Sequence, residues 1–180
     1  IRSRYQHSRT ATINQTRGLI AEYGVVLPKT VSAFHRGLPA VLEDGDNALT
    51  PIARRALAQL YQDYLSCTNR IARMDAQLAD IARQHPTVHA LTKIRGIGPI
   101  TAVALYACIG SGHQFRNARQ LAAWIGLVPK HRGSGGKVQL GSISKRGNAY
   151  IRLLLIHGAR TVMNWMKNKD DTLSRWARQL

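Results

Sequence analysis

Acidic residues are scarce in this 180-residue sequence. Nine aspartates and glutamates stand against 26 lysines and arginines, which gives a formal net charge of +17. Self-repulsion on that scale opposes a compact fold, so we expect a polyanionic partner to offset it. Nucleic acid is the first candidate for that partner and an anionic membrane surface is the second.

Long apolar runs and cysteines are also rare. A membrane-spanning helix needs about 18 apolar residues in a row, whereas the longest uninterrupted run here covers residues 102–109, and the start carries no signal-peptide pattern. The two cysteines, Cys67 and Cys108, form no CxxC pair, so we expect them to be reduced and buried in a cytosolic protein. Residue 1 is Ile rather than Met, and we expect the sequence to be part of a longer protein.

The few carboxylates are unevenly placed along the chain. None lies between residues 81 and 169, a stretch that contains 14 lysines and arginines. This stretch is therefore the expected polyanion-binding surface, and its binding should depend steeply on salt. It cannot hold a carboxylate-based magnesium site by itself, because such sites need several Asp or Glu oxygens. His85 and His89 are four residues apart, but Pro86 disturbs the helix that would align them and no third ligand is evident, so we expect no zinc.

The pattern of apolar, capping and breaking residues predicts a mainly α-helical fold. One long helix followed by a compact helical domain is expected. The predicted helices are 2–23, one or two short helices within 29–42 broken near Gly37 and Pro39, a long helix over 50–84 with Thr50 as its cap, 87–93, a helix from about 99 through Cys108, one from Asn117 to 125, and 149–167, with 126–148 as a loop that could include a short hairpin.

The helix predicted over residues 50–84 has apolar residues spaced alternately three and four apart. They are Leu57, Leu60, Tyr64, Cys67, Ile71, Met74, Leu78 and Ile81. This spacing is typical of a coiled coil or a long antiparallel helix pair. The alternative is a helix packed on the core of its own domain. We favour a coiled coil that makes a homo-oligomer.

The Gly96-Ile97-Gly98 turn between two predicted helices fits a helix-hairpin-helix unit. In such a unit the glycines and the following helix N-terminus let the backbone approach a phosphate, without sequence specificity. The alternative is a tight turn that needs glycine for its geometry only. Because basic residues lie beside the turn, we favour phosphate contact. The predicted contacts are Lys93, Arg95, Gly96 and Gly98.

A second candidate site lies in the glycine- and serine-rich segment 130–148. Ser134 stands between two glycines, so its hydroxyl could be exposed, and nearby cations could stabilise a phosphate in transfer. From the residues alone, a flexible basic loop on the nucleic-acid backbone is favoured, because no His-Asp relay is visible. The predicted contacts here are Lys130, Arg132, Lys137, Lys145, Arg146 and Arg152.

Four stretches in order then carry a resemblance. They are IRGIGPIT at 94–101, FRNARQLAAWIGLVP at 115–129, Ser134-Gly135-Gly136, and ISKRGNAYIRLLL at 143–155. Together they resemble the C-terminal transposase domain of the IS-one-ten family of insertion-sequence transposases, also called bridge-RNA-guided recombinases. NQTRGLIAEY at 14–23 resembles the end of that family's RuvC-like domain, and the heptad helix resembles its coiled-coil linker. The expected domains are thus 1–49, 50–84 and 85–180.

The resemblance implies a mechanism. A RuvC-like domain with a four-carboxylate (DEDD) magnesium site works with a serine of the C-terminal domain, which attacks DNA and forms a covalent protein–DNA intermediate. That serine corresponds to Ser134 here, ahead of Ser142 and Ser144, so the resemblance reverses the preference for a non-catalytic loop. A non-coding RNA selects target and donor DNA by base pairing.

The expected partners are therefore DNA, a guide RNA and further copies of the chain, in the bacterial cytoplasm at the nucleoid. Without the RuvC-like domain and its magnesium, these 180 residues should bind DNA but not cut it. The alternative is a non-catalytic helix-hairpin-helix module that binds DNA or RNA.

Overall fold

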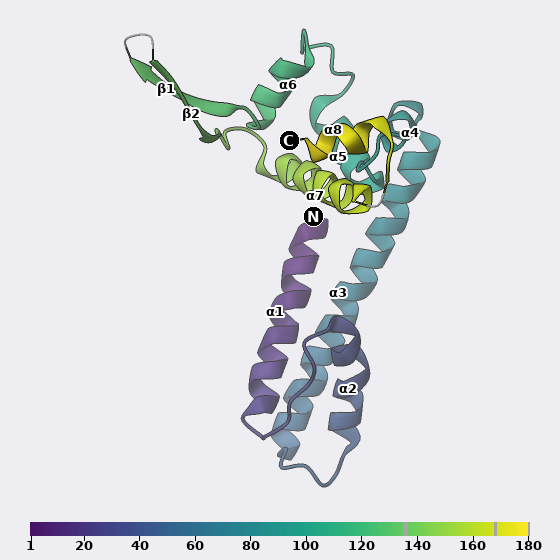
Figure 1. The fold of residues 1–180 in the computed structure, drawn as a ribbon. Coiled ribbons are helices and arrows are strands. Elements are labelled where there is room, and N and C mark those ends of the chain that lie inside the picture. Colours follow the sequence, from purple (N-terminus) through teal and green to yellow (C-terminus); the bar gives the residue numbers. More distant parts are fainter. Residues whose placement is uncertain (135–136, 168, 180) are drawn as a thin grey trace. The chain divides into compact units, whose positions relative to one another are not determined.

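Two helical units make up the chain. The computed structural model describes residues 1–134, 137–167 and 169–179, and leaves the side chains of Arg132, Ser134, Lys137, Val138 and Arg178 undescribed. The chain divides into an N-terminal unit, Ile1–Ala76, and a C-terminal unit, Gln77–Leu180. Helices dominate both units (Figure 1), so the predicted mainly α fold is confirmed.

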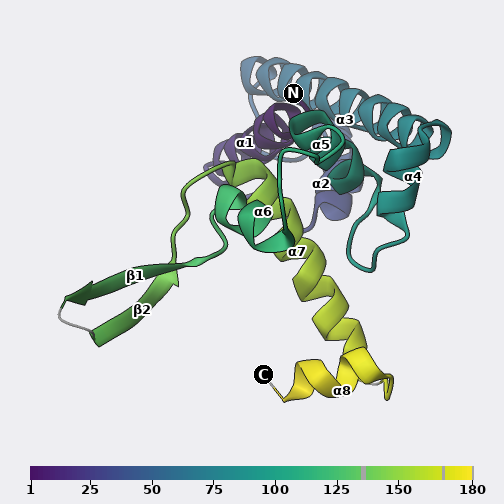
Figure 2. The same ribbon diagram turned by 90° about the horizontal axis from the view of Figure 1, so that it is seen from above.

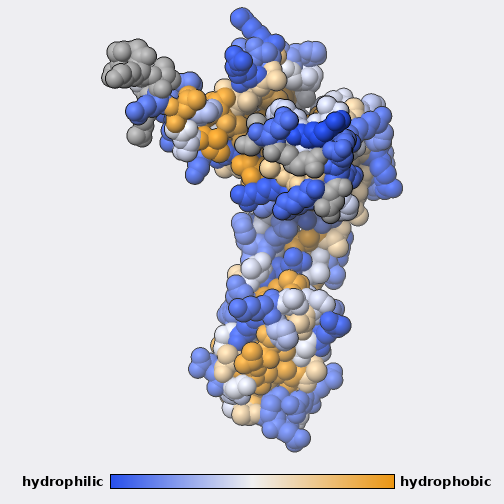
Figure 3. All heavy atoms as spheres, viewed as in Figure 1, coloured by the Kyte–Doolittle hydropathy of each residue, from blue (hydrophilic) through white to orange (hydrophobic). Residues whose placement is uncertain are grey.

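The N-terminal unit is framed by two antiparallel helices, α1 (Arg2–Ala21) and α3 (Pro51–Gln84). The last turns of α3 belong to the C-terminal unit. The two helices lie side by side in Figure 1, with Arg2 paired to Asp75 and the Arg70 guanidinium donating to the Tyr5 hydroxyl over 2.9 Å. A third helix, α2 (Val31–Glu43), packs at the other end of the pair. The buried core residues are Ile13, Ile20, Phe34, Leu38, Leu49, Leu57 and Tyr64. Figure 3 shows hydrophobic residues gathered at this end of the unit.

The regularly spaced apolar residues of α3 pack against other helices of the same chain. Leu57 and Tyr64 belong to the core that α1 and α2 complete, and Ile71 is buried as well. Of the two arrangements that this spacing predicted, the antiparallel helix pair is therefore present inside one chain. Self-association through α3 stays a prediction.

One prediction for α2 is wrong. The helix was expected to break near Gly37 and Pro39, yet it runs unbroken with Pro39 inside it. Proline removes the N–H that would bond to the carbonyl of residue i−4, here His35, and the Tyr61 hydroxyl donates to that carbonyl over 3.2 Å instead. Gly37 makes room for a neighbour, because a Cβ there would lie 2.7 Å from Leu27 Cδ2.

The C-terminal unit contains the remaining elements. The helices are α4 (Pro86–Thr92), α5 (Pro99–Ile109), α6 (Ala118–Ile125), α7 (Ala149–Met166) and α8 (Thr172–Arg178). The strands β1 (Pro129–Ser134) and β2 (Lys137–Ile143) pair antiparallel, with an irregularity between Pro129 and His131. This hairpin reaches away from the helices of its unit in both Figure 1 and Figure 2. The short hairpin that the prediction for residues 126–148 allowed is therefore present.

Two small clusters form the core of this unit. Ala82, Val88 and Ala102 make one, and Leu105, Ile125 and Ile151 make the other. Leu91 and Ile97 pack against both clusters. Ile97 sits between the two glycines of the predicted turn, so one side of that turn is anchored in the core.

The local capping signals are largely confirmed. Thr50 accepts from the Ala53 N–H over 3.1 Å at the start of α3, and Asn117 accepts from the Gln120 N–H over 3.0 Å at the start of α6. Asn148, which was not predicted as a cap, accepts from the Tyr150 N–H over 3.0 Å at the start of α7. Helix α8 was not predicted. Its cap is Asp171, which accepts from the Ser174 N–H over 2.8 Å.

The expectation for the cysteines is partly wrong. Both are free, but Cys67 is half-buried and Cys108 is exposed. Cys108 lies in the penultimate position of α5, where the short helix leaves one side open to solvent, and Asn148 Nδ2 approaches its sulfur to 3.6 Å. Across the part of the chain that is described, no helix is both long and apolar enough to cross a membrane.

Candidate nucleic-acid interface

Positive charge is concentrated in the C-terminal unit. Residues 77–180 contain 16 lysines and arginines against three aspartates, a formal net charge of +13. Residues 1–76 contain ten lysines and arginines against six aspartates and glutamates, a formal net charge of +4. The candidate interface is therefore built from the exposed cations of the C-terminal unit, at the turn before α5, on the hairpin and in the loop before α7.

Gly96 in the turn before α5 is held against helix α7. Its φ is +86°, and a Cβ on Gly158 of α7 would lie 2.0 Å from the Gly96 carbonyl oxygen. The two backbones are thus in direct contact, which accounts for both glycines by packing. Gly98 differs, since it is exposed and no atom lies within 4 Å of where its Cβ would be. The predicted phosphate contact fits Gly98 better than Gly96.

The two cations beside this turn are in different situations. Lys93 is exposed at the end of α4, whereas Arg95 donates to Asp171 Oδ2 over 2.6 Å. The Ser174 hydroxyl, the Arg95 guanidinium and the Ser174 amide hold the pKa of Asp171 well below its ordinary 3.8. The hydroxyl contact falls short of full hydrogen-bond geometry, so the two N–H donors carry more weight. Arg95 thus fastens the turn to the α8 cap.

The loop before α7, residues 144–148, is locked onto the end of α6 by two glycines; we call it the basic strap. A Cβ on Gly126 would lie 1.8 Å from the Arg146 carbonyl oxygen, and one on Gly147 would lie 1.9 Å from the Trp124 carbonyl oxygen. Both glycines have positive φ, +80° and +94°. Only a residue without a side chain allows this approach.

The strap presents two of the predicted contacts to solvent. Lys145 and Arg146 are both exposed, and Lys145 has a φ of 55°, rare for a residue with a side chain. Its backbone N–H donates to the Gly126 carbonyl over 3.1 Å, which stabilises this conformation. The two cations therefore stand on a fixed backbone.

Arg152, also predicted to contact nucleic acid, is occupied inside the protein. Its Nη1 donates to the Ile125 carbonyl over 2.8 Å and to the Arg146 carbonyl over 3.4 Å. It ties the strap to α6 from the first turns of α7. Its observed contacts are those of a positioning residue.

The hairpin carries the remaining predicted residues. Lys130 is exposed on β1, and Ser134 is the last residue of β1, in register with Lys137. The side chains of Ser134, Arg132 and Lys137 lie outside the described residues, as do residues 135 and 136. Of the alternative serines, Ser142 is exposed on β2, and Ser144 donates its backbone N–H to the Val128 carbonyl over 2.8 Å.

Among the described residues no three His, Cys, Asp or Glu side chains gather in a way that could hold an ion. His85 packs its ring against Tyr106, with centroids 4.3 Å apart, while His89 is exposed.

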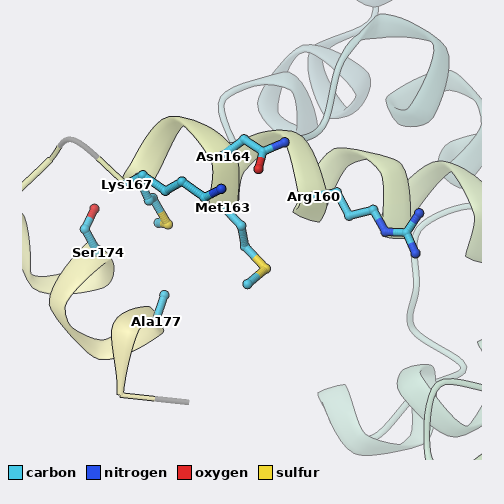
Figure 4. A pocket seen from close by; sticks show the side chains of 7 residues that line it. Arg160, Met163, Asn164, Lys167, Ser174 and Ala177 are labelled. Carbon is cyan, nitrogen blue, oxygen red and sulfur yellow. The ribbon is translucent and has the colours of Figure 1, made fainter.

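Two hollows flank the C-terminal half of α7, and the sequence did not predict them. The larger, about 490 Å³, lies between α7 and α8; Arg160, Met163 and Lys167 line it on the α7 side, and Ser174 and Ala177 line it from α8 (Figure 4). The smaller, about 280 Å³, lies between α7 and the glycine turn and includes Trp165 and Lys169. A tryptophan among closely spaced cations was the only sequence signal for them, and α8, which closes the larger, was not predicted.

The C-terminal unit contains the segment that known proteins share. Residues 88–175 match the transposase IS116/IS110/IS902 family. Over its full length the chain is 42% identical to the transposase for insertion sequence element IS1111A of Coxiella burnetii, covering 50% of that protein. It is 40% identical to a probable family 20 transposase of Pseudomonas aeruginosa, covering 54%, and 31% identical to the transposase for insertion sequence element IS1328 of Yersinia enterocolitica, covering 52%.

The match lies in this basic, helical unit, and it places the chain in the class of insertion-sequence transposases. The chain belongs to the IS116/IS110/IS902 transposase family. It spans about half the length of the relatives named above.

Proposed function

We propose that this chain is part of an insertion-sequence transposase and binds DNA through its C-terminal unit. The observation that carries this proposal is a coincidence of position. The segment shared with the transposase family, residues 88–175, lies within the unit of net charge +13. Cations that neutralise phosphates release counterions from DNA, so binding should weaken steeply as salt rises.

The basic strap supplies the contacts proposed first, Lys145 and Arg146. Because its backbone is fixed by Gly126 and Gly147, little conformational entropy is lost when DNA binds. Lys93 and Lys130 are exposed and extend this surface. Arg132 and Lys137 are proposed from their place in the sequence alone.

Two other predicted contacts take a different role in this proposal. Arg95 would have to exchange Asp171 for a phosphate, so it contributes less than an unpaired cation. Arg152 acts indirectly, by holding the strap carbonyls. Phosphate contacts of this kind fix position on DNA but do not read its sequence.

Ser134 is the proposed nucleophile in the complete enzyme. It ends β1 on a hairpin that reaches away from the helices, a position from which a hydroxyl can meet a DNA backbone. In the proposed step the Oγ–phosphorus bond forms while the bond from phosphorus to the departing deoxyribose oxygen breaks. The proton that the hydroxyl loses is balanced by the one that the departing oxygen takes up.

Magnesium does not fit the donors of this chain. Residues 81–169 contain no carboxylate, and the described residues hold no cluster of ligands. In the complete transposase a RuvC-like domain would supply the carboxylate site, and a guide RNA, a further partner proposed for this chain, would select the DNA. We also propose that copies of the chain associate through α3, and that the protein acts in the bacterial cytoplasm.

The test is a covalent-adduct assay on the complete transposase with its guide RNA, magnesium and a nicked DNA that traps the intermediate. A protein–DNA adduct that disappears with Ser134→Ala and persists with Ser142→Ala supports the serine mechanism. An adduct that survives Ser134→Ala moves the nucleophile elsewhere. Tight, salt-sensitive DNA binding with no adduct in any sample would leave a binding module without this chemistry.

A further inference from the structure

Trp165 is unusually exposed for a tryptophan. Its indole, on the last turns of α7, is 71% exposed, although burying so large a ring is normally favourable. It lies in a unit with many cations. Exposed aromatic rings combined with cations are how proteins hold single strands without reading their sequence.

The indole borders the smaller hollow rather than an open surface. Val162 and Met166 line the hollow from α7, Arg95 and Gly96 line it from the turn before α5, and Lys169 closes it after α7. At about 280 Å³ it is just below the range of pockets for drug-sized ligands, so it has room for one ring system. Met166 is buried and Gly96 is half-buried and packed against Gly158, so these parts of the wall are fixed.

The described residues that line the hollow include two cations and no carboxylate, and Lys169 is the one of the two that is not paired with Asp171. Lys169 is exposed at its edge, and Arg95 forms another part of the wall. Two carboxylates follow in the sequence, Asp170 and Asp171, and Asp171 is neutralised by Arg95 while it caps α8. A phosphate is thus expected on the Lys169 side.

We propose that this hollow binds one unpaired base of single-stranded DNA, stacked on Trp165, with the adjoining phosphate at Lys169. The choice of DNA rests on the proposed function. Bases in a duplex are stacked on one another and present only their edges, so they cannot enter. The larger hollow, on the other side of Met166, offers methionines and cations but no aromatic ring (Figure 4), so the base belongs in the smaller one.

The experiment compares binding of a labelled 12-nucleotide oligo(dT) and a 12-base-pair duplex by the whole chain, using fluorescence anisotropy. Trp165→Ala should weaken oligo(dT) binding by about 5- to 150-fold, the range for loss of one stacked base. Duplex binding should change less than about twofold, and Trp165→Phe, which keeps a stacking face, should retain most of the single-strand affinity. Trp176→Ala is the matched control, since that indole is 57% exposed on α8 but does not line the hollow.

A second measurement reads the stacking directly. With Trp124 and Trp176 replaced by phenylalanine, Trp165 is the only tryptophan in the chain, and oligo(dT) should quench its fluorescence. No quenching, equal losses on both DNAs, or an unchanged single-strand affinity in Trp165→Ala would overturn the inference. Clear preference for oligo(U) would overturn the choice of DNA. If the chain binds neither DNA, the proposed function itself fails.

Discussion

Glycines in the C-terminal unit act by bringing backbones together. Gly126 meets the strap carbonyl of Arg146, Gly147 meets the carbonyl of Trp124, and Gly96 meets Gly158. Each contact joins residues at least 20 positions apart in the chain. A glycine-rich sequence invites a prediction of flexible loop, but these glycines fix the loops that carry the exposed cations.

Gly126→Ala should destabilise the C-terminal unit by about 3 kcal/mol or more. The added Cβ would lie 1.8 Å from a backbone oxygen that no side-chain rotation can move, and the φ of +80° adds strain. Urea unfolding followed by tryptophan fluorescence measures this, because all three tryptophans lie in residues 77–180. Gly98→Ala is the control and should shift stability by less than about 1 kcal/mol. Equal stability of both variants would mean that the strap is not locked as described.

Helix ends were the elements that the sequence predicted best, because their signals are local. Thr50, followed by Pro51, and Asn117 each accept a hydrogen bond from the N–H three residues ahead. Other features depend on contacts distant in sequence. The Tyr61 bond that supports α2 spans 26 residues, and the Arg95–Asp171 pair that ties the turn to α8 spans 76. The residues next to Pro39 and Arg95 in the sequence do not indicate either of these contacts.

Contacts between residues distant in the sequence also limit how much of the candidate site can be predicted. Lys93, Lys130, Lys145 and Arg146 are exposed, and their contact with nucleic acid stays a prediction. Arg152 could not be separated from them by sequence, since its guanidinium is held by carbonyls of other elements. The hollow at Trp165 requires α7 to pack against the turn before α5, a contact set by Gly96 and Gly158.

Pro39→Ala tests how much the proline inside α2 costs the fold while the Tyr61 hydrogen bond to His35 is kept. Alanine restores the missing N–H and removes the ring, and proline is about 3 kcal/mol worse than alanine inside a helix. The unfolded chain gains freedom without proline, which offsets part of this, so we expect stabilisation by about 1 to 2 kcal/mol in far-UV circular dichroism. Pro51→Ala, at the first position of α3 where proline is well accommodated, should give no such gain. Loss of stability in Pro39→Ala would contradict this account.

At the level of the whole molecule, the two units differ more in charge than in secondary structure. Both are helical, yet one carries +13 and the other +4. The N-terminal unit buries a continuous core between three helices, whereas the C-terminal unit has two small clusters and several glycine contacts. We therefore expect the N-terminal unit to contribute more to the stability of the chain, and the C-terminal unit to contribute more to DNA binding.

This division predicts how salt will affect binding in variants of either unit. For duplex DNA the slope of log K against log salt is about −0.9 per neutralised phosphate. Replacing both Lys145 and Arg146 by alanine should therefore make the slope shallower by about 1.8. The matched control removes two exposed cations of the N-terminal unit, Lys29 and Arg36, and should leave the slope nearly unchanged.

Anisotropy titrations with a labelled 20-base-pair duplex at several salt concentrations provide both slopes. Since each double variant lowers the net charge of the chain by two, a pure net-charge effect would flatten them equally. A loss of slope confined to the strap variant would instead mean that phosphates contact the strap itself. Equal losses would show that the rigid backbone of residues 144–148 gives Lys145 and Arg146 no special place in DNA binding, and the proposed interface would have to be sought at Lys93 and along the hairpin.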